Sequence, residues 1–249
     1  MRGLPLGPGF RVERHASLPS TNDALRAYAE AGEPAGLIVN AAEQTAGRGR
    51  QGRSWDSPPG NFYASLLLRP RVPLAEAASL SLVTALAVVD GLARLLEEPS
   101  RLAVKWPNDV LLDRAKLGGI LLEGADDGQG GCAWLIIGLG MNLAAAPAGL
   151  PYAAASFATT GLILTPDEFM GLWLPAMRHR IGIWEEGGFA AVRSDWLASA
   201  HGLGNQATLR LGAETIRGRF ADLGEDGSIL IENELGCLAR HTAGELFFP

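Results

Sequence analysis

Apolar residues occur in short runs over about the first 200 positions of the chain, which predicts a fold that mixes strands with helices. Runs of roughly four to eight apolar or alternating residues between turn residues are typical of strands. The strands predicted in this way cover residues 10–15, 36–42, 61–69, 102–106, 109–112, 116–123 and 134–139. Residues 109–123 are expected to form a hairpin that turns at residues 113–115.

Two helices are expected between these strands. The first covers residues 22–29 and is expected to begin at Ser20 or Thr21, because Ser and Thr side chains accept hydrogen bonds from the free N–H groups at a helix start. The second covers residues 74–96, which are apolar and rich in Ala and Leu. An apolar segment of this length without strand alternation predicts a single buried helix.

The helical pattern returns after residue 160. Apolar residues recur at helical spacing over residues 169–184, and Pro175 inside this stretch predicts either a kink or a helix boundary. The Trp and Met residues of this stripe are expected to lie in the core. A last helix is expected over residues 189–200.

The pattern changes after residue 202, where short strands alternate with Gly and Asp turns. The predicted strands cover residues 207–211, 214–221, 228–232 and 236–241. A module this short buries too little surface to be stable alone, so we expect it to pack on the rest of the chain. The sequence therefore predicts an α+β chain with a first domain of residues 1–202 and a second, all-β domain of residues 203–249.

The composition excludes several classes of protein. A formal net charge of -6 argues against general binding to nucleic acid or membrane surfaces. The first ten residues lack the apolar stretch of a signal peptide, and we expect no membrane-spanning helix. Cys132 and Cys237 lie far apart and fit reduced thiols, so a cytoplasmic location is expected. The four histidines show no metal-ligand spacing.

Three arginines lie within six residues of this acidic chain: Arg48, Arg50 and Arg53, followed by Trp55. Their charges repel one another, and a guanidinium offers donors that match a phosphate or a carboxylate, so the segment predicts an anion site beside an aromatic surface. The spacing of its glycines matches the dinucleotide fingerprint Gly-x-Gly-x-x-Gly. We reject that interpretation because the following residues 53–60 cannot open a helix.

Only two of the 21 basic residues are lysines, Lys105 and Lys116. Each lies in an otherwise apolar segment. A compact ammonium group on a flexible stem is not interchangeable with a planar guanidinium. These two positions therefore indicate places where a point charge is needed in a narrow site.

Five motifs occur in an order that closely resembles the biotin protein ligase family over nearly the whole chain. They are Ser20-Thr21-Asn22, Glu43-Gln44-Thr45-Ala46-Gly47-Arg48-Gly49-Arg50-Gln51-Gly52-Arg53-Ser54-Trp55, Lys105-Trp106-Pro107-Asn108-Asp109, Lys116-Leu117-Gly118-Gly119-Ile120-Leu121-Leu122-Glu123 and Gly138-Leu139-Gly140-Met141-Asn142-Leu143. The resemblance implies a biotin/lipoate ligase-like catalytic domain, with a mixed β-sheet flanked by helices, and a C-terminal SH3-like β-barrel.

The resemblance also implies a reaction in two steps. The carboxylate of biotin attacks the α-phosphate of ATP, with Mg²⁺, to give biotinoyl-5′-AMP and pyrophosphate. The biotinoyl group then passes to one lysine of the biotin carboxyl carrier domain of a carboxylase. A carboxylate is already ionised at pH 7, so the first step needs cations and no general base.

Individual residues take roles by the same resemblance. Biotin is expected to contact Ser20, Thr21, Asn22, Gln44, Arg48, Gly49, Arg50 and Lys105. The nucleotide is expected to contact Arg50, Arg53, Trp55, Asn108 and Asn142. The expected catalytic groups are Arg48, Arg50 and Lys105. The sequence does not identify the ligands of Mg²⁺.

Some of these residues have simpler interpretations. Ser20 could act only as a helix cap, and Asn108 and Asp109 could only shape a turn. Lys116 could belong only to the hairpin and ranks below Lys105.

Other functions stay open at this point. A lipoate ligase or octanoyl transferase could use the same fold, and a non-catalytic biotin-binding protein could retain it. Some family members carry an N-terminal helix-turn-helix domain and repress transcription. Here the catalytic region begins almost at Met1, so we expect no sequence-specific DNA binding and no membrane association. The oligomeric state is undetermined, with a homodimer among the options.

Overall fold

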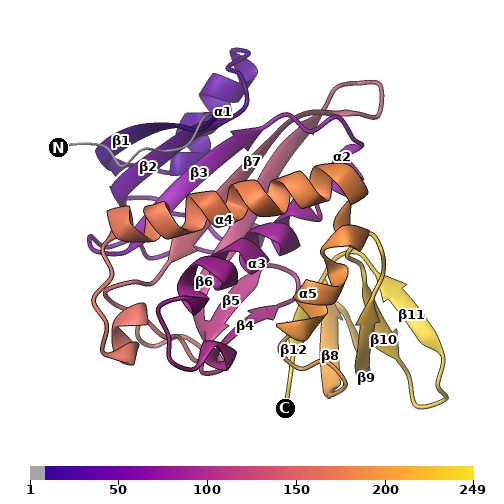
Figure 1. The fold of residues 1–249 in the computed structure, drawn as a ribbon. Coiled ribbons are helices and arrows are strands. Elements are labelled where there is room, and N and C mark those ends of the chain that lie inside the picture. Colours follow the sequence, from indigo (N-terminus) through magenta and orange to yellow (C-terminus); the bar gives the residue numbers. More distant parts are fainter. Residues whose placement is uncertain (1–8) are drawn as a thin grey trace.

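The computed structural model describes residues 9–249, and its larger part is a seven-stranded mixed sheet in the order β1-β2-β3-β7-β6-β5-β4 (Figure 1). The strands are β1 (Arg11–Leu18), β2 (Leu37–Gln44), β3 (Phe62–Leu68), β4 (Leu102–Lys105), β5 (Asp109–Leu112), β6 (Ala115–Asp126) and β7 (Cys132–Met141). All seven strands predicted for this region are confirmed. Only β1 and β2 pair in parallel, which requires a crossover helix between them.

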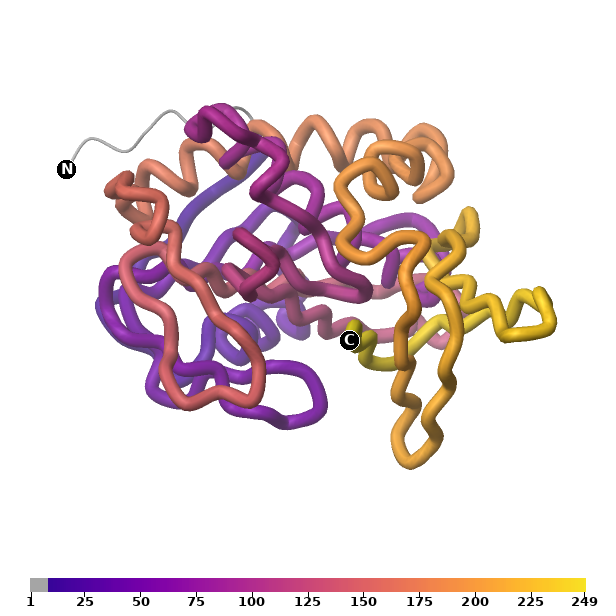
Figure 2. The backbone as a smooth tube through the Cα atoms, turned by 90° about the horizontal axis from the view of Figure 1, so that it is seen from below, coloured from indigo at the N-terminus to yellow at the C-terminus, as the bar shows by residue number. Residues whose placement is uncertain are grey.

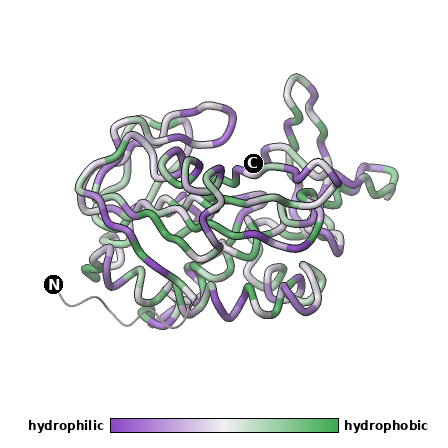
Figure 3. The backbone as a smooth tube through the Cα atoms, turned by 90° about the horizontal axis from the view of Figure 1, so that it is seen from above, coloured by the Kyte–Doolittle hydropathy of each residue, from purple (hydrophilic) through white to green (hydrophobic). Residues whose placement is uncertain are grey.

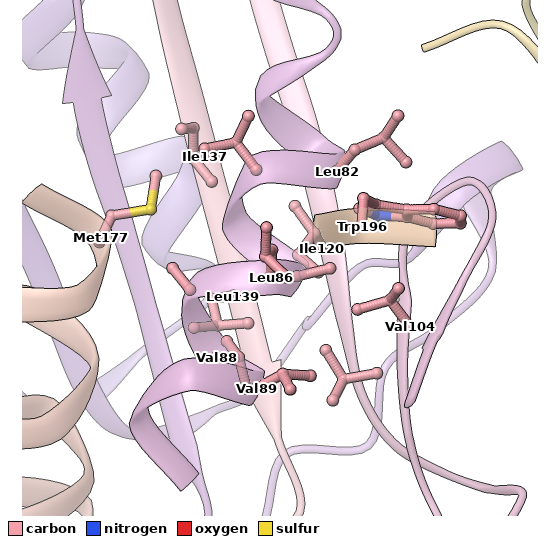
Figure 4. Packing of buried hydrophobic residues seen from close by; sticks show 14 of the residues in the cluster. Leu82, Leu86, Val88, Val89, Val104, Ile120, Ile137, Leu139, Met177 and Trp196 are labelled. Carbon is pink, nitrogen blue, oxygen red and sulfur yellow. The ribbon is translucent and has the colours of Figure 1, made fainter. Parts of the chain in front are cut away.

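Helices cover both faces of this sheet (Figure 1). They are α1 (Thr21–Glu30), α2 (Leu74–Ala77), α3 (Leu80–Ala93), α4 (Pro166–Gly187) and α5 (Arg193–Ala198). Side chains alternate along the strands: Ile38 and Ile137 join the large core under α3 and α4, whereas their neighbours Val39 and Ile136 join a smaller cluster under α1. Figure 4 shows residues of α3 packed against the strands within the large core.

The segment predicted as one helix over residues 74–96 is interrupted at Ser79. The Ser79 hydroxyl donates to the Glu76 carbonyl (2.7 Å) and accepts from the indole N–H of Trp184 (2.9 Å), so a polar side chain ends α2 before α3 begins. Residues 74–93 are long and apolar enough to cross a membrane, and 67% of that window is buried inside the protein. This segment is therefore the core helix of the fold.

Two further helix predictions need correction. α4 continues through Pro175, so of the two predicted outcomes the helix boundary is wrong, and the kink stays a prediction. Trp173 and Met177, on either side of Pro175, are buried in the core. Their burial compensates for the hydrogen bond that proline cannot make. The helix predicted over residues 189–200 is a 3₁₀ turn, Phe189–Ala191, followed by the short α5.

A second, antiparallel sheet of five strands follows in the order β11-β10-β9-β8-β12 (Figure 1). The strands are β8 (Gln206–Leu211), β9 (Glu214–Leu223), β10 (Ile229–Glu232), β11 (Leu238–His241) and β12 (Glu245–Phe247). The first four were predicted. β12 was missed because three residues are too few to show a strand pattern. This sheet agrees with the SH3-like module implied by the resemblance.

The two sheets are joined by a continuous core. Leu209 and Phe220 of the second sheet belong to the same hydrophobic cluster as α3 and the main sheet. The Trp106 indole donates to the Gly227 carbonyl (3.1 Å), which fixes the β9–β10 turn against the end of β4. Figure 2 shows the C-terminus ending beside the main sheet, and Figure 3 shows hydrophobic and hydrophilic stretches alternating along the chain. The division at residue 202 stays a prediction.

The packing of this turn gives a stability prediction. Gly227 has φ +84°, and a Cβ there would lie 2.7 Å from Cδ1 of Leu82, whereas Gly128 has φ +80° with no atom near a Cβ. Both Gly→Ala variants should lose about 1–2 kcal/mol because the left-handed backbone is strained. Gly227→Ala should lose about 1–3 kcal/mol more by overpacking the core. Equal losses of the two variants in urea unfolding would show that Gly227 is not closely packed against Leu82.

Candidate active site

One cavity of about 1600 Å³ lies between the end of the main sheet and the second sheet. It gathers the sequence-predicted residues Ser20, Thr21, Asn22, Gln44, Arg48, Gly49, Arg50, Arg53, Trp55, Lys105 and Asn108. Eight lysine and arginine side chains line it against three side-chain carboxylates. The cavity is therefore cationic in a chain with a net charge of -6, and its charge suits an anionic ligand.

One end of the cavity is a neutral hydrogen-bonding network at the start of α1. Ser20 caps the helix by accepting from the Asp23 N–H (3.4 Å), and Gln44 Oε1 accepts from the Thr21 N–H (2.8 Å). Asn22 Oδ1 accepts from the Ser65 hydroxyl (2.6 Å). Ser20 is thus a helix cap that also lines the cavity.

β7 comes close to this network. A Cβ at Gly138 would lie 2.3 Å from Asn22 Oδ1, so only glycine leaves room for that side chain. Ser65, fully buried on β3, also supports the network, and sequence reasoning missed it. The available signal was a hydroxyl inside the apolar strand 62–68, where a buried polar group needs a partner.

The arginine loop is a small hairpin. Arg48 and Ser54 form an antiparallel bridge, and the Trp55 N–H donates to the Gly47 carbonyl (2.9 Å). At its tip is a 3₁₀ turn, Arg50–Gly52, with Gln51 at φ 58°. The absence of an opening helix here agrees with the rejection of the dinucleotide fingerprint.

Each loop arginine contacts a different part of the protein. Arg48 pairs with Asp23 of α1 and lies 3.3 Å from Glu123 of β6, and Arg53 pairs with Glu245 of β12. These carboxylates offset the mutual repulsion that the sequence predicts for the loop.

Arg50 differs from the other two arginines because its hydrogen-bond partners are neutral. It donates to Asn108 Oδ1 (3.2 Å) and to the Gly244 carbonyl (3.1 Å). Burial lowers the pKa of Arg50 from its ordinary value, although the nearby Glu245 and Asp109 oppose that effect. The guanidinium nonetheless stays charged. Its charge is therefore the least compensated in the loop and is directed into the cavity.

The two lysines lie beside Asp109. Lys105 is paired with Asp109 in the β4–β5 register, and Lys116 Nζ lies 2.6 Å from Asp109 Oδ1. Burial lowers the pKa of Lys105, and the charge of Lys116 lowers it further, while Asp109 and Glu245 act in the opposite direction. Lys105 Nζ also lies 5.7 Å from the ring centroid of Phe247. Lys116, which ranked below Lys105 on sequence grounds, lines the same cavity.

Trp55 lies against the floor of the cavity. A Cβ at Gly140 would come within 2.6 Å of the indole Nε1, and one at Gly119 within 3.5 Å of the indole ring. Lys116 Nζ lies 5.4 Å from the indole ring. The indole N–H is buried and has no hydrogen-bond partner among the described residues. The flat apolar surface of the indole suits an aromatic ring, whereas its N–H is directed to the β-sheet beside Gly140.

Asn142 is placed differently from the other predicted residues. It is buried, is absent from the cavity lining, and donates to the Ala155 carbonyl (3.2 Å). Residues 153–155 in turn bond to the backbone of Lys116. In this structure Asn142 braces the strand segment beside Lys116, and its expected contact with adenine stays a prediction.

The C-terminal strand supplies cavity residues that sequence reasoning missed. Glu245 and Phe247 of β12 and Arg210 of β8 line the cavity, and Arg210 lies 4.7 Å from the Phe247 ring centroid. Glu245 and Phe247 were missed because β12 itself was not predicted, and Arg210, on the predicted strand 207–211, was missed because the sequence does not show that the second sheet faces the cavity. The second sheet is therefore part of the site.

Comparisons with known proteins agree with this geometry. The model of the biotin/lipoate A/B protein ligase family matches residues 15–142. The biotin--[acetyl-CoA-carboxylase] ligase of Paracoccus denitrificans is 41% identical over 216 residues, covering 84% of this chain and 89% of that protein. The bifunctional ligase/repressor BirA of Bacillus subtilis (strain 168) is 32% identical, covering 94% of this chain and 73% of that protein.

A solved structure extends the similarity to the whole fold. The biotin protein ligase from Aquifex aeolicus in complex with biotin and ATP has a TM-score of 0.81 and 29% identity, covering 95% of this chain and 97% of that chain. The second sheet lies within this match, as the coverage of both chains requires. The chain belongs to the biotin/lipoate A/B protein ligase family, among its biotin protein ligases.

Proposed function

We propose that this chain is an ATP-dependent ligase that adenylates biotin and transfers it to a lysine of a biotin carboxyl carrier domain. One observation carries the proposal: a neutral hydrogen-bonding end and a cationic end meet in one cavity. Biotin has the same two parts, a neutral ureido ring and a carboxylate. The Paracoccus relative is named for acetyl-CoA carboxylase, so we propose the carrier domain of a carboxylase of this kind as the acceptor.

The neutral end is proposed to bind the ureido ring through Ser20, Thr21, Asn22 and Gln44. These groups are held by their own hydrogen bonds, so they offer donors and acceptors in fixed positions. A ligand without a ureido group would leave their remaining donors and acceptors unpaired, which costs binding energy. This favours biotin over lipoate or octanoate, because the end opposite the carboxylate is less polar in those two molecules.

The cationic end is proposed to bring the biotin carboxylate to the α-phosphate. A carboxylate oxygen forms a bond to phosphorus, and the bond from phosphorus to the bridging oxygen breaks as pyrophosphate leaves. Arg48, Arg50 and Lys105 hold the two anions together and stabilise the charge that develops on the phosphoryl oxygens. Arg50 is suited to this because its charge has only neutral partners.

The nucleotide is proposed to lie with its adenine near Trp55 and its phosphates near Arg50, Arg53 and Asn108. The indole face in the cavity lining supports the first placement. In the second step the amine of the acceptor lysine attacks the acyl carbon, and AMP leaves with the electrons of the broken acyl–oxygen bond. The same cations stabilise the departing phosphate.

Mg²⁺ is proposed to enter with ATP. Among residues 9–249 no cluster of three or more His, Cys, Asp or Glu side chains could hold a metal ion. Magnesium in phosphate-transfer sites uses one or two carboxylates together with substrate phosphates, and the cavity offers Asp109 and Glu245, which pair with Lys116 and Arg53. The donor set thus fits a nucleotide-borne ion, which when bound would neutralise phosphate charge.

We further propose a cytoplasmic enzyme that does not recognise a DNA sequence. The free thiols Cys132 and Cys237 support the location, and the acidic net charge supports the absence of DNA binding. A homodimer is also proposed, since β1 forms an edge of the main sheet and pairs only with β2 within the described residues, whereas the other edge, β4, is covered by residues 199–201.

Exchange of labelled pyrophosphate into ATP tests the reaction. We expect exchange that depends on biotin, followed by a mass increase of a carrier domain that corresponds to one biotinoyl group. Exchange driven by lipoate or octanoate instead would assign a different ligand. Biotin binding without exchange would identify a non-catalytic protein.

Removal of single cations tests their assigned roles. Arg50→Ala and Lys105→Ala should each lower the exchange rate by about 10²–10³-fold, because each removes a charge aimed at the developing negative charge. Arg217→Ala is the matched control, since Arg217 is an exposed arginine of β9 outside the cavity lining. Near-normal exchange in both cavity variants, with an unchanged unfolding midpoint, would contradict these roles.

The pKa of Lys105 gives a pH prediction. Lys105 acts as the ammonium form, and its pKa is lowered from the ordinary 10.5, so the charge is lost at a lower pH than in a free lysine. In pyrophosphate exchange, kcat/KM for biotin should therefore fall on the alkaline side below pH 10.5. Lys105→Arg should be slower at neutral pH, but its alkaline decline should move to higher pH because guanidinium stays charged. An identical decline in both enzymes would exclude Lys105 as its source.

A further inference from the structure

Glu123 of β6, which pairs with Ile136 of β7, accepts hydrogen bonds from three side chains, two on α1 and one on the arginine loop. Its carboxylate accepts from Asn22 Nδ2 (2.9 Å), from Arg26 (2.7 Å) and from Arg48 (3.3 Å). The side chain is 18% exposed and does not line the cavity. Glu123 therefore lies behind the groups assigned to biotin.

The contact with Glu123 fixes the orientation of the Asn22 amide. A carboxylate only accepts hydrogen bonds, so the amide must turn its Nδ2 toward Glu123 and its Oδ1 toward the Ser65 hydroxyl. Gly138 closes a third side of the same amide. With a neutral partner in place of Glu123, the amide could rotate by half a turn and exchange its donor and acceptor.

The same carboxylate also holds the first arginine of the loop. Arg48 reaches Glu123 and Asp23 together, so it is tied to both β6 and α1. Arg26, on the next turn of α1, forms a 2.7 Å pair with Glu123 but does not line the cavity. Arg26 helps to hold the Glu123 carboxylate in place, while Asn22 and Arg48 carry its effect into the site.

We propose that Glu123 is a positioning residue that orients Asn22 and anchors Arg48, so that recognition of the ureido ring and placement of the arginine loop depend on one carboxylate. This rests on the proposed function for the identity of the ligand. A carboxylate that only stabilised the fold would affect unfolding, whereas this role concerns the affinity for biotin.

Glu123→Gln tests the proposal, because it keeps the shape of the side chain and removes its charge. We expect the dissociation constant for biotin, measured by calorimetry, and KM for biotin to rise by about ten- to a hundred-fold, the range for a lost hydrogen bond to a charged group. KM for ATP should rise by less than KM for biotin, because the arginines assigned to the nucleotide, Arg50 and Arg53, have other partners than Glu123.

Two control variants separate this role from stability. Glu232→Gln removes the carboxylate partner of Arg219 in the second sheet, with a similar exposure of 26%. Arg26→Gln removes only the outer partner of Glu123 and should raise KM for biotin far less than Glu123→Gln. Equal biotin affinity in Glu123→Gln and Glu232→Gln would overturn the proposal, as would a rise in KM for ATP equal to that for biotin.

The wild-type chain in the same experiments separates the proposal from the assigned reaction. Biotin binding without pyrophosphate exchange would contradict the proposed activity, while the difference in dissociation constant would still decide the role of Glu123. No biotin binding by the wild-type chain would overturn both.

Discussion

The site depends on holding three guanidinium groups close together in a chain that is acidic overall. Free in water, such a loop would spread apart because like charges repel. In the fold Arg48 pairs with carboxylates of α1 and β6, and Arg53 pairs with Glu245 of β12, while Arg50 bonds to neutral oxygens between them. The arginine loop thus ties the main sheet to the second sheet. An anion that enters the cavity must compete with the carboxylates and neutral oxygens that these arginines contact.

The three arginines are not equivalent in this exchange. The Arg53 side chain is 56% exposed, and an ion pair as exposed as this one contributes about 0–1 kcal/mol, so phosphates can replace Glu245 at little cost. Arg50 is more deeply buried and hydrogen-bonds only to neutral groups, so the nearby Glu245 and Asp109 offset its attraction for an anion only in part. Lys105 shares this character, because burial lowers its pKa and an incoming negative charge would raise it again. The most buried cations are therefore those that gain most from the reactants.

The sequence predicted most of the fold because the periodic patterns are long and regular in the main sheet and its helices. It was wrong where one side chain decided the outcome. The mostly apolar segment 74–93 divides at Ser79, whose hydroxyl bonds to Glu76 and Trp184, and α4 continues through Pro175 where its neighbours pack in the core. β12 has no pattern of its own, since three residues form a strand only by pairing with β8. Such outcomes depend on tertiary contacts that no local window contains.

The site was predictable to the extent that its residues lie in contiguous motifs. All predicted residues except Asn142 line one cavity, although the motifs are far apart in the chain. Residues that support the cavity residues without lining the cavity were not predictable. Ser65 and Glu123 lie in strands, and the strand pattern indicates only which side chains are buried. Phe247 and Arg210 come from the second sheet and could be assigned only once that sheet was placed.

The two ends of the cavity meet different physical demands, and this explains their construction. The neutral end must keep each donor and acceptor in one orientation, so it is built from buried side chains fixed by one another, such as Asn22 with Ser65. The arginines of the cationic end must change partners when the reactants bind and again when the products leave. This end is accordingly built from long side chains on a loop. Glu123 touches both ends. A single carboxylate therefore orients Asn22 at the neutral end and anchors Arg48 at the cationic end. The position of the arginine loop relative to the ureido contacts is set by this one side chain.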